Sequence, residues 1–184
     1  MATKPKTTLT AEEFLKKYEG VDGNFELVDG VVVEMQSERV KHTIAKGEAF
    51  VALRDAVKKA KLPCQVFTDG ASVKTGKNSV RGPDVAVQCG KQEDPESLLL
   101  SEPMILVEVI SPSSEFRDVH AKMIEYFAIP SVEHYLVIDQ AKRLVIHNKR
   151  QGKAEFFTRF VHNGMLELQP PGLKIKVTDL LGAA

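Results

Sequence analysis

The segment 104–110, MILVEVI, is an uninterrupted apolar run that contains a single charged residue, Glu108. Its length and its Val and Ile content predict a buried β-strand. An ionised carboxylate in such a strand costs several kcal/mol of folding free energy unless it is paired with a cation, protonated or bound to a metal ion. The sequence therefore predicts a fold built around this strand, together with a partner for its acid.

Turn signals and periodicity around this strand predict an α+β fold. Apolar runs at 65–73 and 80–88 precede it as strands, which implies an antiparallel meander. Apolar residues at helical spacing, among them Val40, Ile44 and Val51, predict a long helix over 38–61, and a second helix over 114–128 begins at Ser114 and ends before Pro130. The other predicted elements are a short helix capped by Thr10, a hairpin that turns at Asp29-Gly30, strands at 134–139, 144–148, 154–160 and 173–177, and a closing helix at 178–181. We expect a curved, mainly antiparallel sheet with both longer helices packed on it, in one domain over residues 1–184.

Charge and cysteine content exclude some classes of protein. The 184 residues include 25 Lys plus Arg and 25 Asp plus Glu, so the formal net charge is zero, which argues against a protein held to nucleic acid mainly by bulk charge. The apolar runs are far shorter than the ~20 residues that cross a bilayer. Cys64 and Cys89 lack CxxC spacing, which favours reduced or buried thiols in a cytoplasmic protein over a disulfide or a zinc site.

A second acid, Asp84, lies at the strand before Glu108 in the sequence. Neighbouring strands lie ~4.8 Å apart, so the two carboxylates, with a backbone carbonyl and waters, would form the oxygen-rich ligand set that Mg²⁺ prefers. Lys122 shares a helix face with Asp118 and Tyr126, from which it would orient or deprotonate an attacking water and stabilise charge on phosphorus. The alternatives are a structural ion pair of Glu108 with Lys122 and a simple turn role for Asp84.

Several of these motifs together resemble the Uma-two family, whose members are regarded as restriction endonucleases, and through it the PD-(D/E)XK nuclease superfamily. The resemblance covers nearly the whole chain. It rests on Pro83-Asp84, on residues 105–113 (ILVEVISPS), 118–122 (DVHAK) with Tyr126, 132–139 (VEHYLVID), 25–30 (FELVDG) and 33–35 (VEM), on His42, and on residues 171–173 (PGL).

The resemblance implies a restriction-endonuclease-like core in which Asp84, Glu108 and the carbonyl of Val109 bind Mg²⁺ or Mn²⁺. It also suggests Glu26 as an auxiliary acid and His42 as a further polar group near the site. Ile110 stands where the superfamily pattern places a lysine, and Lys122 occupies the position on the following helix to which the Uma-two family moves it. For Glu26 and His42 the alternatives are a surface glutamate of the hairpin and a structural histidine in the first helical turn.

The sequence lacks GxSxG, Walker, GxGxxG and HExxH motifs, which argues against several hydrolase, nucleotide-binding and zinc-peptidase classes. We therefore expect a Mg²⁺-dependent endonuclease that hydrolyses DNA phosphodiester bonds, without an organic cofactor or membrane partner, and acting as a homodimer. RNA or branched DNA would use the same residues. The alternative is a catalytically silent nucleic-acid-binding or protein-interaction module of the same fold. Basic residues expected around the cleft to contact DNA are Lys74, Lys77, Arg81, Arg117 and Lys122.

Overall fold

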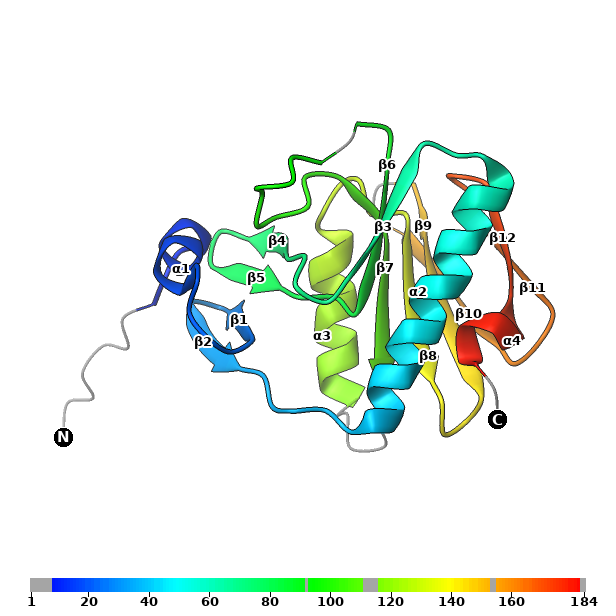
Figure 1. Cartoon of the computed structure of the whole chain (residues 1–184), viewed down its shortest axis with the longest axis horizontal. Coiled ribbons are helices and arrows are strands. Elements are labelled where there is room, and N and C mark those ends of the chain that lie inside the picture. Colours follow the sequence, from blue (N-terminus) through cyan, green and yellow to red (C-terminus); the bar gives the residue numbers. More distant parts are fainter. Residues whose placement is uncertain (1–7, 92, 111–115, 153–154, 183–184) are drawn as a thin grey trace.

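The computed structural model describes residues 8–91, 93–110, 116–152 and 155–182 (Figure 1). Its helices are α1 (Ala11–Tyr18), α2 (Val40–Ala60), α3 (Phe116–Phe127) and α4 (Val177–Leu181). Its strands are β1 (Phe25–Val28), β2 (Val31–Glu34), β3 (Cys64–Thr68), β4 (Val73–Gly76), β5 (Ser79–Arg81), β6 (Val85–Cys89), β7 (Pro103–Ile110), β8 (His134–Asp139), β9 (Leu144–Gln151), β10 (Glu155–Val161), β11 (Met165–Leu168) and β12 (Leu173–Lys176). The predicted α+β fold is confirmed, and the predicted cap of the second helix at Ser114 lies outside the described residues.

A six-stranded sheet in the order β10-β9-β8-β7-β6-β3 forms the centre of the molecule. The predicted strand with Glu108 is β7. It pairs antiparallel with β6 and parallel with β8. Helix α3 connects β7 to β8. Side chains alternate between the two faces of a strand, so Val107 and Val109 pack on the side of α2 and α4, whereas Leu106 packs on the side of α3. Figure 1 shows the sheet between these two layers.

A second sheet, in the order β2-β1-β5-β4, lies beside the first and packs on α1 (Figure 1). Its hairpin turns at Asp29-Gly30 as predicted, with positive φ at both residues (49° and 80°), the combination that a two-residue hairpin turn requires and that Gly adopts without strain. The capping box at Thr10 is likewise confirmed: Oγ1 accepts from the N–H of Glu13, and the Glu13 carboxylate accepts from the N–H of Thr10.

The simple meander predicted from residues 65–110 is wrong in one respect. The runs predicted as strands 65–73 and 80–88 are each divided between the two sheets, so β3 and β6 pair in the large sheet while β4 and β5 form a hairpin in the small one. The second break falls at Gly82-Pro83-Asp84, where proline cannot donate a main-chain hydrogen bond to a continuing ladder. This break places Asp84 between the two sheets. The pair β11–β12 adds a third, two-stranded sheet.

The long predicted helix is α2, but the apolar residues that predict it do not all face the sheet. Val40 and Ile44 are 76% and 59% exposed, whereas the helix packs on the sheet through a row that includes Ala45, Ala49 and Leu53. Alanine lets a helix approach a sheet closely, and α2 has apolar residues on both of its sides, so helical spacing alone does not decide which side is buried.

The expectation of reduced thiols is wrong. Cys64 and Cys89 stand opposite each other in the β3–β6 ladder and form a disulfide. The pairing results from the register of two strands that are remote in sequence, which explains why cysteine spacing gave no signal for it. No helix of the described ranges is long and apolar enough to cross a membrane.

A buried chain of hydrogen bonds crosses β8, β9 and β10. Arg159 can only donate, so Nδ1 of His147 accepts from its guanidinium (3.0 Å), and Nε2 of His147 then donates to Nδ1 of His134 (2.8 Å). Nε2 of His134 in turn donates to the carbonyl oxygen of Pro170 (2.7 Å). Burial lowers the pKa of His134 to about 4 and that of His147 to about 3. Both rings are therefore neutral and structural.

We expect acidification to destabilise the protein through this pair. Between about pH 6.5 and about pH 5 the unfolded chain binds more protons at His134 and His147 than the folded chain, so the free energy of unfolding falls as the pH falls, by up to about 1.4 kcal/mol per pH unit for each histidine. Urea unfolding across this range should show a shallower pH slope for His147→Gln than for the wild type. The raised pKa of Glu108 acts in the opposite direction, but equally in both proteins. His162→Gln, at an exposed position, should keep the wild-type slope, and an unchanged slope in His147→Gln would contradict the account.

Candidate functional site

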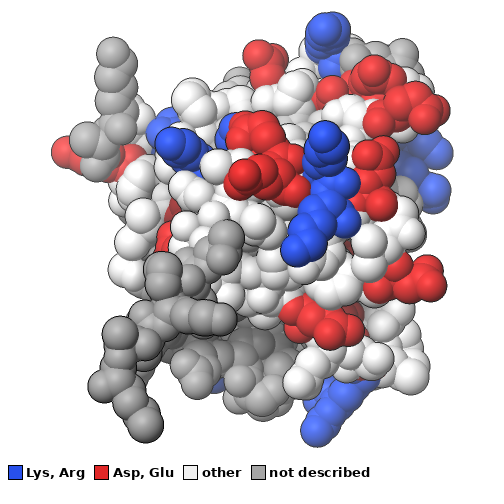
Figure 2. Space-filling view, turned by 90° about the vertical axis from the view of Figure 1, so that its left-hand side faces the viewer, with Lys and Arg blue, Asp and Glu red and all other residues white. Residues whose placement is uncertain are grey.

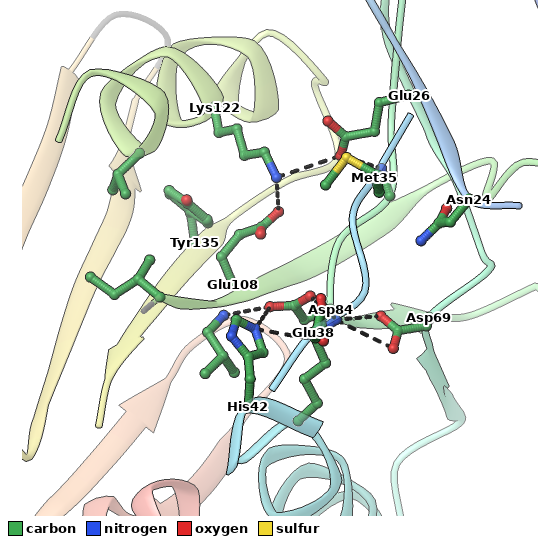
Figure 3. Close-up of a pocket in the computed structure, with 15 residues that line it drawn as sticks. Asn24, Glu26, Met35, Glu38, His42, Asp69, Asp84, Glu108, Lys122 and Tyr135 are labelled. Carbon is green, nitrogen blue, oxygen red and sulfur yellow. Dashed lines mark hydrogen bonds and ion pairs between the residues drawn. The ribbon is translucent and has the colours of Figure 1, made fainter. Parts of the chain in front are cut away.

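A polar pocket opens between the two sheets, the start of α2 and the buried side of α3 (Figure 3). All the residues predicted for the site line it: Glu26 from β1, His42 from α2, Asp84 from the bend before β6, Glu108 and Val109 from β7, and Lys122 from α3. The structure thus brings together residues spread over nearly a hundred positions of sequence. Within the pocket the charged groups form two clusters, one around Glu108 and one around Asp84 (Figure 3).

Glu108 lies on the α3 side of the sheet and is bound there by two side chains of α3. Nζ of Lys122 lies 3.1 Å from its Oε1, and the hydroxyl of Tyr126 donates to the same oxygen at 2.5 Å. Burial nevertheless raises the pKa of Glu108 to about 7. The ion pair with Lys122 considered from sequence is present, and the i, i+4 spacing of Lys122 and Tyr126 explains why both reach one carboxylate.

Glu26 connects Lys122 to the small sheet. Its Oε1 lies 3.5 Å from Nζ of Lys122 and accepts from the N–H of Gly82 (3.1 Å), while its Oε2 accepts from Nη1 of Arg81 (2.9 Å). Arg81 also binds both carboxylate oxygens of Glu125, at 2.8 and 2.6 Å. Glu26 is therefore a buried acid of the pocket wall rather than a surface residue of the hairpin, and this network fixes the position of Lys122.

Asp84 is the centre of the second cluster. Its Oδ1 lies 2.7 Å from Nζ of Lys46, and its Oδ2 accepts from the N–H of Val109 at 2.6 Å. The same lysine lies 2.6 Å from Glu38 and 3.1 Å from Asp69. Burial opposes ionisation of Asp84, but His42 and Lys46 hold the pKa of its carboxyl below the ordinary value. Asp84 is therefore ionised, and contacts at both of its carboxylate oxygens fix its position.

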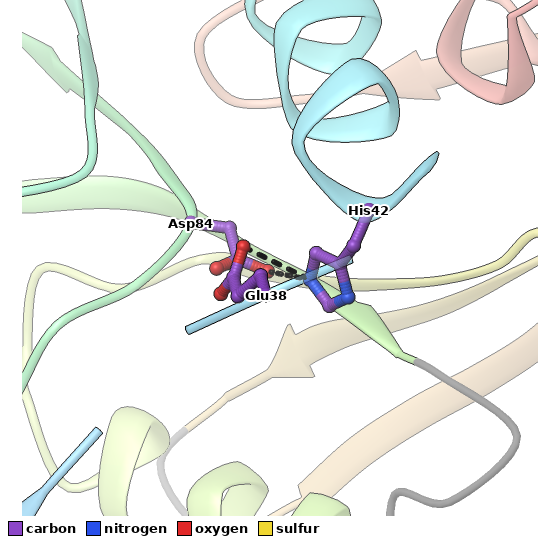
Figure 4. Close-up of side chains that lie close together, drawn as sticks. All are labelled: Glu38, His42 and Asp84. Atoms are coloured by element: carbon purple, nitrogen blue, oxygen red, sulfur yellow. Dashed lines mark ion pairs between the residues drawn. The ribbon is translucent and has the colours of Figure 1, made fainter. Parts of the chain in front are cut away.

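Three side chains of this cluster, Glu38, His42 and Asp84, direct polar atoms that could bind a metal ion toward one another (Figure 4). Nε2 of His42 lies 3.6 Å from Oδ2 of Asp84 and 4.0 Å from Oε2 of Glu38, and the three atoms lie within 4.8 Å of one another. This Nε2 is buried and has no hydrogen-bond partner among the described residues. Glu108 is not a member of this three-residue group, and its Oε1 faces Lys122 and Tyr126. Its role as a metal ligand stays a prediction.

A divalent cation fits this arrangement of donors. A buried imidazole nitrogen without a partner is costly, and a cation between it and the two carboxylate oxygens would satisfy all three. Carboxylates suit Mg²⁺ and Mn²⁺, and an imidazole ligand suits transition metals better than Mg²⁺. The N–H and C=O of a strand residue face the same neighbouring strand, so the carbonyl of Val109 faces the side of Asp84 and stays a predicted ligand.

The basic residues expected to contact DNA are placed differently from the prediction. Arg81 and Lys122 are buried in the ion pairs above, and Lys74 is bound to Glu12. Lys77 is exposed, and the side chain of Arg117 lies outside the described part of the chain. On the face shown in Figure 2, described basic and acidic side chains are interspersed. Two exposed cations lie at the start of α2: Arg39, its N-cap residue, and Lys41, which lines a smaller neighbouring pocket that shares His42, Val109 and Ile110 with this one.

Sequence reasoning missed three charged residues of the pocket: Glu38, Lys46 and Asp69. His42 and Lys46 are spaced i, i+4 on α2, and Glu38 stands four residues before His42, just ahead of the helix. This spacing was the available signal, but α2 has apolar residues on both of its sides, so the spacing did not show that Lys46 is buried. Asp69 follows β3 in a turn and had no distinguishing sequence pattern.

Comparisons with known proteins agree with the fold. The sequence matches the family described as "Putative restriction endonuclease" (Uma2) over residues 11–178. It is 23% identical to an uncharacterized protein of Synechocystis sp., over 94% of this chain and 91% of that protein. Its structure is similar to a crystal structure from Anabaena variabilis described as "a putative nuclease belonging to DUF820", with a TM-score of 0.73 and 19% identity over 94% of this chain and 97% of the other. The last likeness shows the fold, whereas the family match spans most of the sequence, and the chain therefore belongs to the Uma2 family.

Proposed function

We propose that this protein is a divalent-cation-dependent endonuclease that hydrolyses phosphodiester bonds of DNA. The observation that carries the proposal is the convergence of Asp84, Glu38 and His42, whose Nε2 has no hydrogen-bond partner among the described residues, in a pocket that also contains the buried pair of Glu108 and Lys122. Anionic and imidazole donors beside a fixed ammonium are the groups that metal-assisted phosphodiester hydrolysis needs. Membership of the Uma2 family supports the same reaction class.

The residues of the pocket have separate roles in this proposal. A bound cation supplies Lewis acidity toward the phosphate and lowers the pKa of water. Asp84, Glu38 and His42 hold it, and the N–H of Val109 orients Asp84. The ammonium of Lys122, held by Glu26 and Glu108, orients the attacking water and stabilises negative charge on phosphorus. Arg39 and Lys41, both exposed at the start of α2, would contact the flanking DNA phosphates.

One observation favours the silent alternative. The ammonium of Lys46 lies within 3.1 Å of Asp84, Glu38 and Asp69, so part of the negative charge of the pocket is already neutralised without a metal ion. A protein-interaction or nucleic-acid-binding module would keep such an ion-pair network for stability. Metal dependence separates the two readings, because the silent module binds no divalent cation at His42.

The proposal is tested by incubating the purified protein with supercoiled, linear, single-stranded and branched DNA, and with RNA, in Mg²⁺, in Mn²⁺ and in EDTA. We expect nicking in the presence of metal, with Mn²⁺ at least as effective as Mg²⁺ because of the imidazole ligand. Preference for RNA would change the substrate and keep the reaction class. The absence of cleavage from every combination would favour the silent module.

Replacing Lys122 tests its role beside the metal ligands. Lys122→Met keeps most of the buried volume but removes the ammonium, so nicking should fall by about 100-fold or more, as is typical for loss of a positioned proton-transfer or charge-stabilising group. Mn²⁺ affinity, measured by calorimetry, should change little because Lys122 does not contact the Glu38–His42–Asp84 group. Lys142→Met, at a largely exposed position, is the matched control. Wild-type nicking by Lys122→Met would remove Lys122 from the mechanism.

A further inference from the structure

Strand β10 forms one edge of the six-stranded sheet. It pairs with β9 over all seven of its residues without a shift in register, and no described strand pairs with its outer side. Natural edge strands are normally protected by charged side chains, especially Lys, by Pro, by a bulge or by a short length. The sequence of β10, EFFTRFV, contains Glu155 and Arg159 but neither Lys nor Pro, and three of its seven residues are Phe. The strand is therefore a long, regular and largely apolar edge with little protection against pairing with another strand.

Aromatic side chains of this edge are exposed on both faces of the sheet. Phe157 and Phe160 are 51% and 67% exposed, and side chains an odd number of residues apart lie on opposite faces of a strand. Phe156, on the same face as Phe160, stacks on Phe127 of α3 with ring centroids 4.3 Å apart, which fixes the edge against the helix. A strand added to β10 would cover apolar surface above and below the sheet.

The strand is complementary to itself when it is paired antiparallel. In an antiparallel pair, two directly opposite residues point their main-chain N–H and C=O groups either both toward or both away from the partner strand. A two-fold axis between identical strands therefore passes between two copies of the same residue. An axis at Phe157 places Glu155 opposite Arg159 twice and Phe157 opposite Phe157. An axis at Thr158 pairs all seven residues and places Phe156 opposite Phe160 twice. Opposite charges and aromatic pairs directly across from each other both stabilise a sheet.

We propose that β10 is a homodimer interface, in which the strand pairs antiparallel with β10 of a second copy and joins the two large sheets into one. This inference is supported by the position of β10 at the edge of the sheet, by its exposed phenylalanines and by the opposite charges of Glu155 and Arg159, which can pair across the two-fold axis. It does not rest on the proposed nuclease activity, because no residue of β10 lines the pocket described above. A closed two-fold pair is also the commonest form of soluble oligomer.

Size-exclusion chromatography with light scattering tests the proposal on the full chain. The wild type should have twice the chain mass of 20.4 kDa. Phe157→Lys combined with Phe160→Lys introduces the cations that protect natural edges and should raise the dimer dissociation constant by about 100-fold or more, giving the mass of one chain. Ile44→Lys makes the same change at an exposed site on α2 and should leave the dimer intact. A monomeric wild type, or a double variant that remains dimeric while its circular dichroism is unchanged, would overturn the proposal.

Cysteine cross-linking tests the register and remains decisive if the lysine variants unfold. Phe157→Cys or Thr158→Cys places identical thiols opposite each other on the axis, within the ~4.4–6.8 Å between Cα atoms that a disulfide spans. The native cysteines are bonded to each other, so a new reducible dimer on a denaturing gel reports the engineered thiol. We expect one of the two variants to form it. If neither variant does, β10 does not pair with itself.

Discussion

The variant Asp84→Asn should lose at least about 100-fold of the metal-dependent nicking rate, since a bound metal supplies several kcal/mol of transition-state stabilisation. The substitution removes the negative charge of Asp84 from the Glu38–His42–Asp84 group and weakens the bond of this side chain to Lys46. Calorimetry should show weaker Mn²⁺ binding by the same variant. Because the amide is the same size as the carboxylate, and Lys46 keeps Glu38 and Asp69 as partners, the fold should be retained.

The matched control for this prediction is Asp55→Asn. Asp55 lies on the exposed side of α2, and its side chain is 64% exposed. The control should nick DNA at the wild-type rate after the same purification, which separates the activity of the protein from that of a contaminating nuclease. Wild-type nicking by a folded Asp84→Asn would show that the pocket does not catalyse the reaction.

The variant Arg81→Ala should destabilise the fold by about 3–5 kcal/mol, the range found when one partner of a buried ion pair is removed. The side chains of Arg81 and Glu26 are 4% and 5% exposed, and Arg81 also binds Glu125, which joins β5 to β1 and to α3. Without the guanidinium, the buried carboxylate of Glu26 and the half-buried carboxylate of Glu125 both lose a cationic partner. Urea unfolding followed by circular dichroism measures the loss.

Two further variants show how much of that loss of stability comes from burial of the charges. Lys74→Ala removes an exposed ion pair with Glu12 and should cost no more than about 1 kcal/mol. Combining Arg81→Met with Glu26→Gln and Glu125→Gln removes the charges together and should recover part of the stability. If Arg81→Ala is as stable as Lys74→Ala, the buried network does not hold the small sheet against α3.

Local patterns in the sequence predicted the elements, but not how the sheets divide between them. The Asp29-Gly30 hairpin, the Thr10 cap and the β7 strand depend on residues close together in sequence, and each was predicted correctly. The division of the chain at Gly82-Pro83-Asp84 between two sheets depends on contacts with β1, which lies more than fifty positions earlier. Periodicity within one segment contains no information about that partner.

The candidate site shows the same difference. Glu108 was identifiable because an acid in an apolar strand is energetically exceptional, and its partner Lys122 follows from helical spacing. Lys46 carries no such mark, because a lysine on a long helix is normally solvated. Its burial among Glu38, Asp69 and Asp84 is produced by the packing of α2 through its alanine row. The disulfide between Cys64 and Cys89 likewise depends on strand register.

The pocket has a local excess of acids although the whole chain has no net charge. Of the described residues that line the pocket, five are carboxylates and two are lysines: Glu26, Glu38, Asp69, Asp84 and Glu108 against Lys46 and Lys122. A site with this excess of acids repels a phosphate until a cation neutralises it. Affinity for DNA should therefore depend on divalent metal, and weak binding without it is expected.

The most direct test of the proposed metal centre is the nicking rate of supercoiled DNA as a function of Mn²⁺ concentration, for the wild type and for His42→Ala. The wild-type rate should be zero in EDTA and should saturate with Mn²⁺, and the Mn²⁺ concentration for half-maximal rate should be at least about tenfold higher in His42→Ala, because the variant lacks one ligand. His162→Ala, at an exposed histidine, should match the wild type. A rate that is independent of metal, or the same half-maximal concentration in His42→Ala, would contradict the account.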